Sequence, residues 1–176
     1  MSLGRRAGAG VMVLAAVLAG CATPAPPPPQ APAISPPPQA QSHRDGAQAE
    51  VSEAYGRFWS VAQSLPQRPV ERWRPELSTV ATSRLVDTML ANLARHRERG
   101  ITVYGEIHPR ITDVRVEGSR AVVTDCQDAS RSGQADARTG DPRTVGIARN
   151  LVAGTLEHTP EGSWRVARID YPDGDC

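Results

Sequence analysis

The sequence contains no lysine, so all 20 of its basic residues are arginine. The exclusive use of arginine, together with the frequent alanine and proline of the chain, indicates a genome of high GC content. The chain also lacks an excess of either charge. Its formal net charge is +1, and it becomes −1 when Arg5 and Arg6 are removed with the N-terminal segment. A balanced chain has no basic footprint for nucleic acid, and this sequence has no block of charge for docking on anionic lipid. We therefore expect no nucleic-acid partner.

Motifs that bind metals, cofactors or phosphate are absent as well. The sequence has no HExxH, no CxxC and no EF-hand spacing, and its 4 histidines are isolated from one another. No glycine-rich loop follows a predicted strand, and the serine nucleophile motif GxSxG is missing. The sequence therefore predicts no metal ion and no cofactor, and an enzyme is the minority interpretation.

The first 20 residues are predicted to be a secretion signal. Arg5 and Arg6 form a positive start, and residues 11–18 are an apolar run too short to span a bilayer. The run ends in LAGC (residues 18–21), which resembles the lipobox of bacterial lipoproteins. That resemblance implies cleavage before Cys21, lipidation of Cys21, and a location on the extracytoplasmic face of the cell membrane. The alternative is an ordinary secretory signal followed by a chance cysteine.

Residues 21–48 are predicted to be the lipidated cysteine followed by a disordered linker. Their proline density argues against helix and central strand, and they hold almost no side chains that could form a core. A polyproline II chain of this length reaches roughly 80 Å at about 3.1 Å per residue. We expect a tether that holds a domain away from the membrane. A ligand for a proline-binding domain is the alternative.

Residues 49–176 are predicted to form one domain of α+β class. Apolar residues recur at helical spacing over 51–65 and 77–99, with a break near Thr82 and Ser83 and a C-cap at Gly100. The stretch 66–75 between the helices is punctuated by prolines. After Gly100 the apolar period becomes two, which indicates strands. We expect the N-terminal helices to pack on a curved antiparallel sheet of about four strands, as in a cone or cystatin-like roll. The expected strands are 101–107, 111–116, 120–126, 145–158 and 164–169, with a long polar loop at 130–143.

Two of the three cysteines are predicted to form a disulfide. If Cys21 carries lipid, Cys126 and Cys176 remain as an even pair in an exported protein, where disulfides persist. The alternative is two free, buried thiols.

If the domain were an enzyme acting in a pocket between its helices and its sheet, it would need a general base. Asp125 and His108 are the candidates, both weak. Asp125 precedes Cys126 on a strand, so the two side chains point to opposite faces. The alternatives are that Asp125 caps a strand end or pairs with an arginine, and that His108 lies in an exposed bend before Pro109. Three further candidates are Tyr104, Asp113 and Asp128.

The domain resembles the nuclear transport factor 2-like superfamily, especially its secreted or lipid-anchored bacterial branch. The likeness covers nearly all of residues 49–176. It is carried by the aromatic opening helix with Tyr55, Phe58 and Trp59, the helical run closing at Gly100, and the short motifs AVV (121–123), DCQD (125–128) and GSWRV (162–166). The resemblance implies a conical fold with a pocket between helices and sheet. Such pockets serve isomerases, cyclases and dehydratases in some branches and only bind ligands or partners in others.

Three functional hypotheses follow from these features. The first is a lipid-anchored, non-catalytic domain that binds a small apolar ligand or an envelope protein. The second is a cyclase- or isomerase-like enzyme that uses a carboxylate or histidine in the pocket. The third is a structural accessory subunit of an envelope or transport complex.

The anchoring hypothesis predicts that Cys21→Ala releases the protein from membranes or blocks its maturation. The reason is that two or three acyl chains, at roughly 0.8 kcal/mol per buried CH₂, supply durable attachment through this one sulfur. Intact-mass analysis of the detergent-extracted protein measures the modification. An unmodified residue other than Cys21 at the mature N-terminus would contradict the hypothesis.

Overall fold

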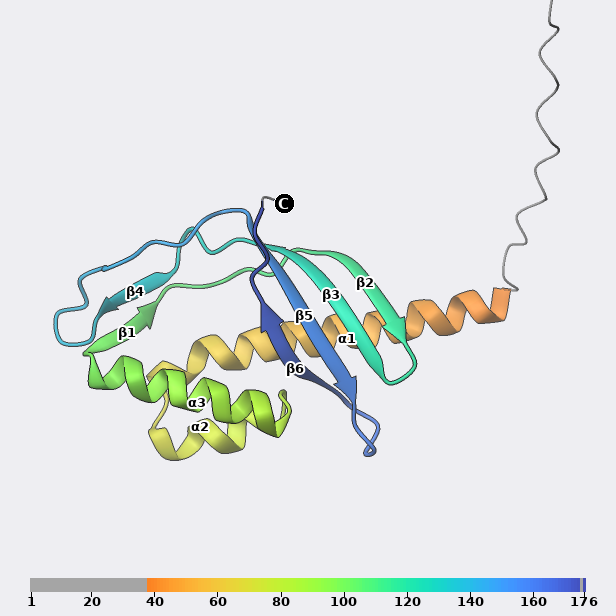
Figure 1. The fold of residues 1–176 in the computed structure, drawn as a ribbon, viewed down its shortest axis with the longest axis horizontal. Coiled ribbons are helices and arrows are strands. Elements are labelled where there is room, and N and C mark those ends of the chain that lie inside the picture. Colours follow the sequence, from red (N-terminus) through yellow and green to blue (C-terminus); the bar gives the residue numbers. More distant parts are fainter. Residues whose placement is uncertain (1–37, 175) are drawn as a thin grey trace, which may run out of the picture. The chain divides into compact units, whose positions relative to one another are not determined.

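The fold is α+β, with three N-terminal helices packed against antiparallel sheet (Figure 1). A computed structural model describes residues 38–174 and 176, so the predicted signal, Cys21 and most of the predicted linker lie outside the described residues. No helix in the described part of the chain is long and apolar enough to cross a membrane. The elements are α1 (Pro38–Ser64), η1 (Leu65–Gln67), α2 (Val70–Leu77), α3 (Ser83–Glu98), β1 (Ile101–Tyr104), β2 (Ile111–Glu117), β3 (Arg120–Gln127), β4 (Gly133–Asp136), β5 (Asn150–His158) and β6 (Trp164–Asp170).

The first helix begins earlier than the sequence indicates. Residues 38–48 were expected to belong to a linker without helix, yet α1 starts at Pro38. Proline is tolerated in the first turn of a helix, and no further proline follows until Pro66, just beyond the end of α1. Residues 41–46 are exposed and continue a helix whose later turns pack on the sheet. Gln48, just after them, donates its Nε2 to the Val114 carbonyl at 2.7 Å and so joins this part of α1 to β2.

The proline-punctuated stretch 66–75 also contains a helix that the sequence does not predict. Helix α2 begins after Pro69, and Pro75 lies in its last turns. The short helix is held by Trp73, which is buried and donates its indole N–H to the Arg68 carbonyl at 3.0 Å. The predicted break before Ser83 is confirmed, because α3 starts there.

Four strands form the main sheet, in the order β2-β3-β5-β6 with every pair antiparallel. One face is apolar and packs against α1, and the other carries polar side chains, as the period of two predicts. On the packed face Ala121, Leu156 and Val166 lie in register across three strands and are buried. The predicted α+β class and the meander of about four antiparallel strands are therefore confirmed.

The remaining two strands form a small separate sheet. The expected strand 101–107 is present as β1 (Ile101–Tyr104), but it lies outside the main sheet, and its partner β4 was not predicted. Strand β4 lies within the predicted loop 130–143 and pairs with β1, while β5 begins at Asn150 and not near Val145. The polar sequence GQAD of β4 has no apolar alternation, so its pairing depends on tertiary contacts. Gly133 allows one of them, because a Cβ there would overlap the Thr144 carbonyl. Tyr104 Oη donates to the same carbonyl at 3.0 Å.

The core lies between α1 and the main sheet. Val51, Tyr55 and Phe58 project from one face of α1 and are at most 1% exposed. The ring of Tyr55 lies close to β5 at Gly154, where an added Cβ would stand 2.5 Å from the ring carbon Cε2. A glycine in mid-strand is thus required for this close approach.

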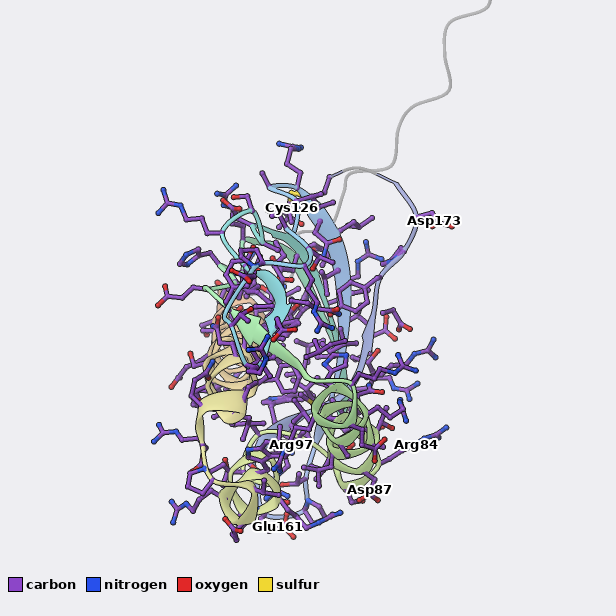
Figure 2. The ribbon with its side chains drawn as sticks, turned by 90° about the vertical axis from the view of Figure 1, so that its left-hand side faces the viewer. Arg84, Asp87, Arg97, Cys126, Glu161 and Asp173 are labelled. Carbon is purple, nitrogen blue, oxygen red and sulfur yellow. A yellow bond between two sulfur atoms is a disulfide. The ribbon has the colours of Figure 1, made fainter. Side chains whose placement is uncertain are left out.

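A disulfide joins Cys126 at the end of β3 to Cys176, with the two Cα atoms 5.5 Å apart. The two cysteines are separated by 50 residues in sequence. The bond holds the tail that follows β6, and Figure 2 shows Cys126 at the same end of the domain as Asp173 of that tail.

We predict that Cys176→Ser lowers the free energy of unfolding by about 4 kcal/mol, because the bond restricts a loop of this length in the unfolded chain. A typical domain has roughly 5–15 kcal/mol in total. Urea unfolding measures the loss, and the double variant Cys126→Ser/Cys176→Ser is expected to match the single one. Two reactive thiols in the unfolded, unreduced wild-type protein would contradict the bond.

Candidate ligand-binding site

A cavity of about 550 Å³ lies among α1, α3 and the small sheet. Its walls come from six segments of the chain, within 58–66, 85–96, 103–107, 132–134, 144–146 and 169–171. The lining is mainly apolar and aromatic. The side chains are Phe58, Trp59 and Ala62 of α1, Leu85, Met89 and Leu93 of α3, Val103 and Tyr104 of β1, Ile107, Val145, and Ile169 and Tyr171 at the C-terminal end.

The cavity exists because α3 does not pack closely on the rest of the core. Leu85, Met89 and Leu93 recur every four residues and form one stripe of the helix, yet all three are only partly buried. The one fully buried residue of α3 is Val86, in its first turn. Apolar stripes of amphipathic helices normally face a filled core. Here the stripe faces a space that a ligand of matching size can fill.

A second, polar stripe of α3 runs beside the apolar one. Thr88, Asn92 and His96 also recur every four residues and line the same cavity. On the opposite wall Gln63 is already occupied, since its Oε1 accepts from the Ile107 amide at 2.8 Å and its Nε2 reaches the Ile107 carbonyl at 3.4 Å. On α3 the Thr88 hydroxyl donates to the Arg84 carbonyl at 3.0 Å and Asn92 Oδ1 accepts from Arg95, so the Asn92 amide N–H₂ and His96 are the groups left for a ligand there. On α1 the buried indole Nε1 of Trp59 has no hydrogen-bond partner among the described residues. Figure 2 shows Arg84 and Asp87, also on α3, pointing outward, away from this interior.

Asp125 does not line the cavity. It is fully buried on the packed face of β3, opposite to Cys126 as predicted. Its carboxylate accepts the hydroxyl of Tyr55 at 3.0 Å, the backbone N–H of Arg110 at 2.6 Å and the amide of Gln127 at 3.4 Å. The predicted arginine pairing is thus a backbone contact and not an ion pair.

The titration of this buried group is shifted by its surroundings. Burial raises the pKa of Asp125, although the bonds from Arg110, Tyr55 and Gln127 lower it in part. Burial also raises the pKa of Tyr55, and the nearby Asp125 carboxylate adds to that shift. The Tyr55 hydroxyl therefore acts as a donor to Asp125 that joins α1 to the sheet.

The other candidate residues are dispersed. His108 is exposed as expected, with Nε2 3.8 Å from the Glu106 carboxylate, but its backbone forms an antiparallel bridge with Asp128 and not the expected bend. Asp128 binds Ser130 and Arg110, and the hydrogen bonds from Ser130 lower the pKa of Asp128 the most.

Asp113 pairs with Arg115 at 2.7 Å on β2. Of the five predicted candidates only Tyr104 lines the cavity, and no Asp or Glu is among the described residues that line it. In residues 38–174 and 176 no group of three or more His, Cys, Asp or Glu side chains could hold a metal ion.

Sequence reasoning missed His96 and the segments 132–134 and 144–146 as parts of this site. The sequence could have indicated His96, because it lies three residues after Leu93 and so falls beside the apolar stripe on the same helix face. The other two segments are polar or glycine-bearing and carry no period, so nothing in the sequence places them beside β1.

No protein-family model and no curated protein sequence matches this chain. Among solved structures, the intermembrane-space region of the chloroplast protein ARC6 is similar, with 13% identity and a TM-score of 0.54 over 72% of this chain and 97% of that one. This likeness supports the α+β fold alone.

Two bacterial structures are also similar, each over 74% of this chain. A conserved protein from Planctomyces limnophilus has 13% identity and a TM-score of 0.44 over 99% of its length. A protein from Catenulispora acidiphila has 14% identity and a TM-score of 0.45 over 94% of its length.

The buried carboxyl of Asp125 predicts how stability depends on pH. Since burial raises the pKa of Asp125 in the folded protein, the folded state binds this proton more tightly than the unfolded state. The Asp125 contribution to stability is therefore greatest below the unfolded pKa of about 3.9 and falls as the pH rises through the folded pKa. Asp125→Asn removes this titratable group, so the free energy of unfolding should fall less steeply as the pH rises.

Urea midpoints between acid and neutral pH measure this effect. The matched control is Asp141→Asn, at an exposed aspartate, and its urea midpoint should change with pH as steeply as that of the wild type. Asp125→Ala should instead lose about 1–3 kcal/mol at every pH, because the Tyr55 hydroxyl and the Arg110 amide lose their acceptor. Equal slopes for Asp125→Asn and the wild type would contradict the shift.

Proposed function

We propose that this protein is a lipid-anchored lipoprotein on the extracytoplasmic face of the cell membrane whose domain binds a small apolar ligand without catalysis. The observation that carries the proposal is the apolar cavity of about 550 Å³ beneath the half-buried stripe of α3. This volume lies in the range usual for small-molecule sites, which are mostly apolar with a few polar groups that orient the ligand. The resemblance to the nuclear transport factor 2-like superfamily belongs to the same proposal.

The lining defines the chemistry of the ligand. An apolar body of about the size of the cavity would contact Phe58, Met89 and Leu93. One or two hydrogen-bonding groups at its edge would meet Asn92 and His96 on the polar stripe of α3. A strongly anionic ligand is disfavoured, because no arginine lines the cavity in the described part of the chain.

The enzymatic alternative has less support. A cyclase or isomerase needs a general base within reach of the substrate. Asp125 is engaged with Tyr55 under α1, and His108 lies outside the cavity. His96 would be the remaining candidate. The accessory-subunit alternative has no comparable feature to favour it.

The test replaces a small residue of the cavity lining with a large one. Ala62→Phe places a ring inside and should weaken binding of a neutral apolar fluorophore, such as N-phenyl-1-naphthylamine, about tenfold or more, which corresponds to about 1.4 kcal/mol. The matched control is Ala91→Phe, at an exposed position of α3. Fluorescence titration measures both affinities. Equal affinities for Ala62→Phe, Ala91→Phe and the wild type would exclude the cavity as the binding site.

A further inference from the structure

A buried hydrogen-bond donor without a partner belongs to the lining of the cavity. Trp59 is 7% exposed and lines the cavity from α1, and its indole Nε1 has no partner among the described residues. The only other buried side-chain atom in this condition within those residues is Arg165 Nε, and Arg165 does not line the cavity. Buried donors are nearly always paired, because an unpaired N–H loses its bonds to water and gains none in return.

The Tyr55 hydroxyl is a polar neighbour of this N–H, but it does not pair with it. The two rings meet edge to face, with their centroids 6.1 Å apart. Burial raises the pKa of Tyr55, and the nearby indole N–H opposes this shift. The hydroxyl gives its own proton to Asp125 at 3.0 Å, and Trp59 forms no hydrogen bond to it. Trp59 therefore lies between the buried pair of Tyr55 and Asp125 and the space of the cavity.

The wall beside Trp59 is apolar or already hydrogen-bonded. Residues three and four positions further along a helix share its face. On α1 these are Ala62, which is apolar, and Gln63, whose Oε1 accepts from the Ile107 amide at 2.8 Å. No Asp or Glu lines the cavity in the part of the chain that the structure describes. A ligand group beside Trp59 therefore meets one donor and apolar surface.

We propose that the ligand of the cavity carries a neutral carbonyl group, as in a ketone, ester or amide, whose oxygen accepts a hydrogen bond from Trp59 Nε1. An indole N–H can only donate, so its partner has to be an acceptor. A carbonyl oxygen brings no proton of its own. A ligand hydroxyl could also accept from Trp59, but its proton would be left unpaired beside Ala62 and the occupied Gln63. The inference rests on the proposed function, because it names the polar group of the same ligand.

Trp59 differs in burial from the polar groups of α3. Asn92 is exposed and His96 is half-buried, so water can satisfy both when no ligand is bound. Trp59 Nε1 is covered by its neighbours, and a ligand reaches it after small side-chain movements of the kind that commonly accompany binding. The requirement for an acceptor therefore comes from α1, whereas the groups of α3 accept a wider range of partners.

The test compares a ketone with an alcohol on the same carbon skeleton, 2-acetylnaphthalene and 1-(2-naphthyl)ethanol. Each displaces N-phenyl-1-naphthylamine from the full chain carrying Cys21→Ala, so that no acyl chain competes for the cavity. The ketone should bind about tenfold more tightly than the alcohol, which is the order expected for one buried hydrogen bond. Trp59→Phe keeps an aromatic ring and removes the N–H. It should weaken the ketone about tenfold and the alcohol at most about twofold, for the same reason.

The matched control is Trp73→Phe, which removes an indole N–H that donates to the Arg68 carbonyl and should keep the wild-type ratio of ketone to alcohol affinity. Equal affinities of the parent chain for ketone and alcohol overturn the inference even if Trp59→Phe is unstable. An unchanged ratio in Trp59→Phe also overturns it and assigns the N–H to the packing of Tyr55. If Ala62→Phe changes neither affinity, the proposed function fails as well. If Ala62→Phe weakens both ligands and Trp59→Phe leaves the ratio unchanged, only the carbonyl inference fails.

Discussion

The contact of Tyr55 with the main sheet determines the position of α1, and most other features follow from that position. The ring lies against the backbone at Gly154, and its hydroxyl donates to the buried carboxylate of Asp125. The contact combines the burial of a large aromatic side chain with one oriented polar bond. It sets the height of α1 above the sheet, and Phe58 and Trp59, in the next turn, become the inner wall of the cavity.

Elements whose apolar pattern has a clear period were predictable. The alternating apolar residues of β2, β3 and β6 pack in or against the core as expected, and the break before Ser83 is visible in the sequence because Thr82 and Ser83 interrupt the apolar period. The elements missed are those whose stability comes from distant contacts. Strand β4 depends on the close approach at Gly133, and α2 depends on the burial of Trp73 despite its prolines.

The candidate site was predictable only in part, for a related reason. The family resemblance implies a pocket between helices and sheet, but the sequence does not reveal that Asp125, a weak candidate base, instead accepts the hydroxyl of Tyr55. Its neighbour Cys126 faces the other side of the strand, as alternation requires. Which face carries the cavity could not be read from one strand, because it depends on where α1 and α3 are placed above the sheet.

The loose packing of α3 links the stability of this helix to the occupancy of the cavity. Val86 is its one fully buried residue, so opening α3 exposes less apolar surface than opening the sheet. A ligand that covers Met89 and Leu93 restores the missing contacts and stabilises the closed helix by mass action. The disulfide acts on the opposite wall, where it holds the tail that carries Tyr171. The disulfide thus secures one part of the cavity lining covalently, whereas α3, on another part, is held by a single fully buried residue and several half-buried ones.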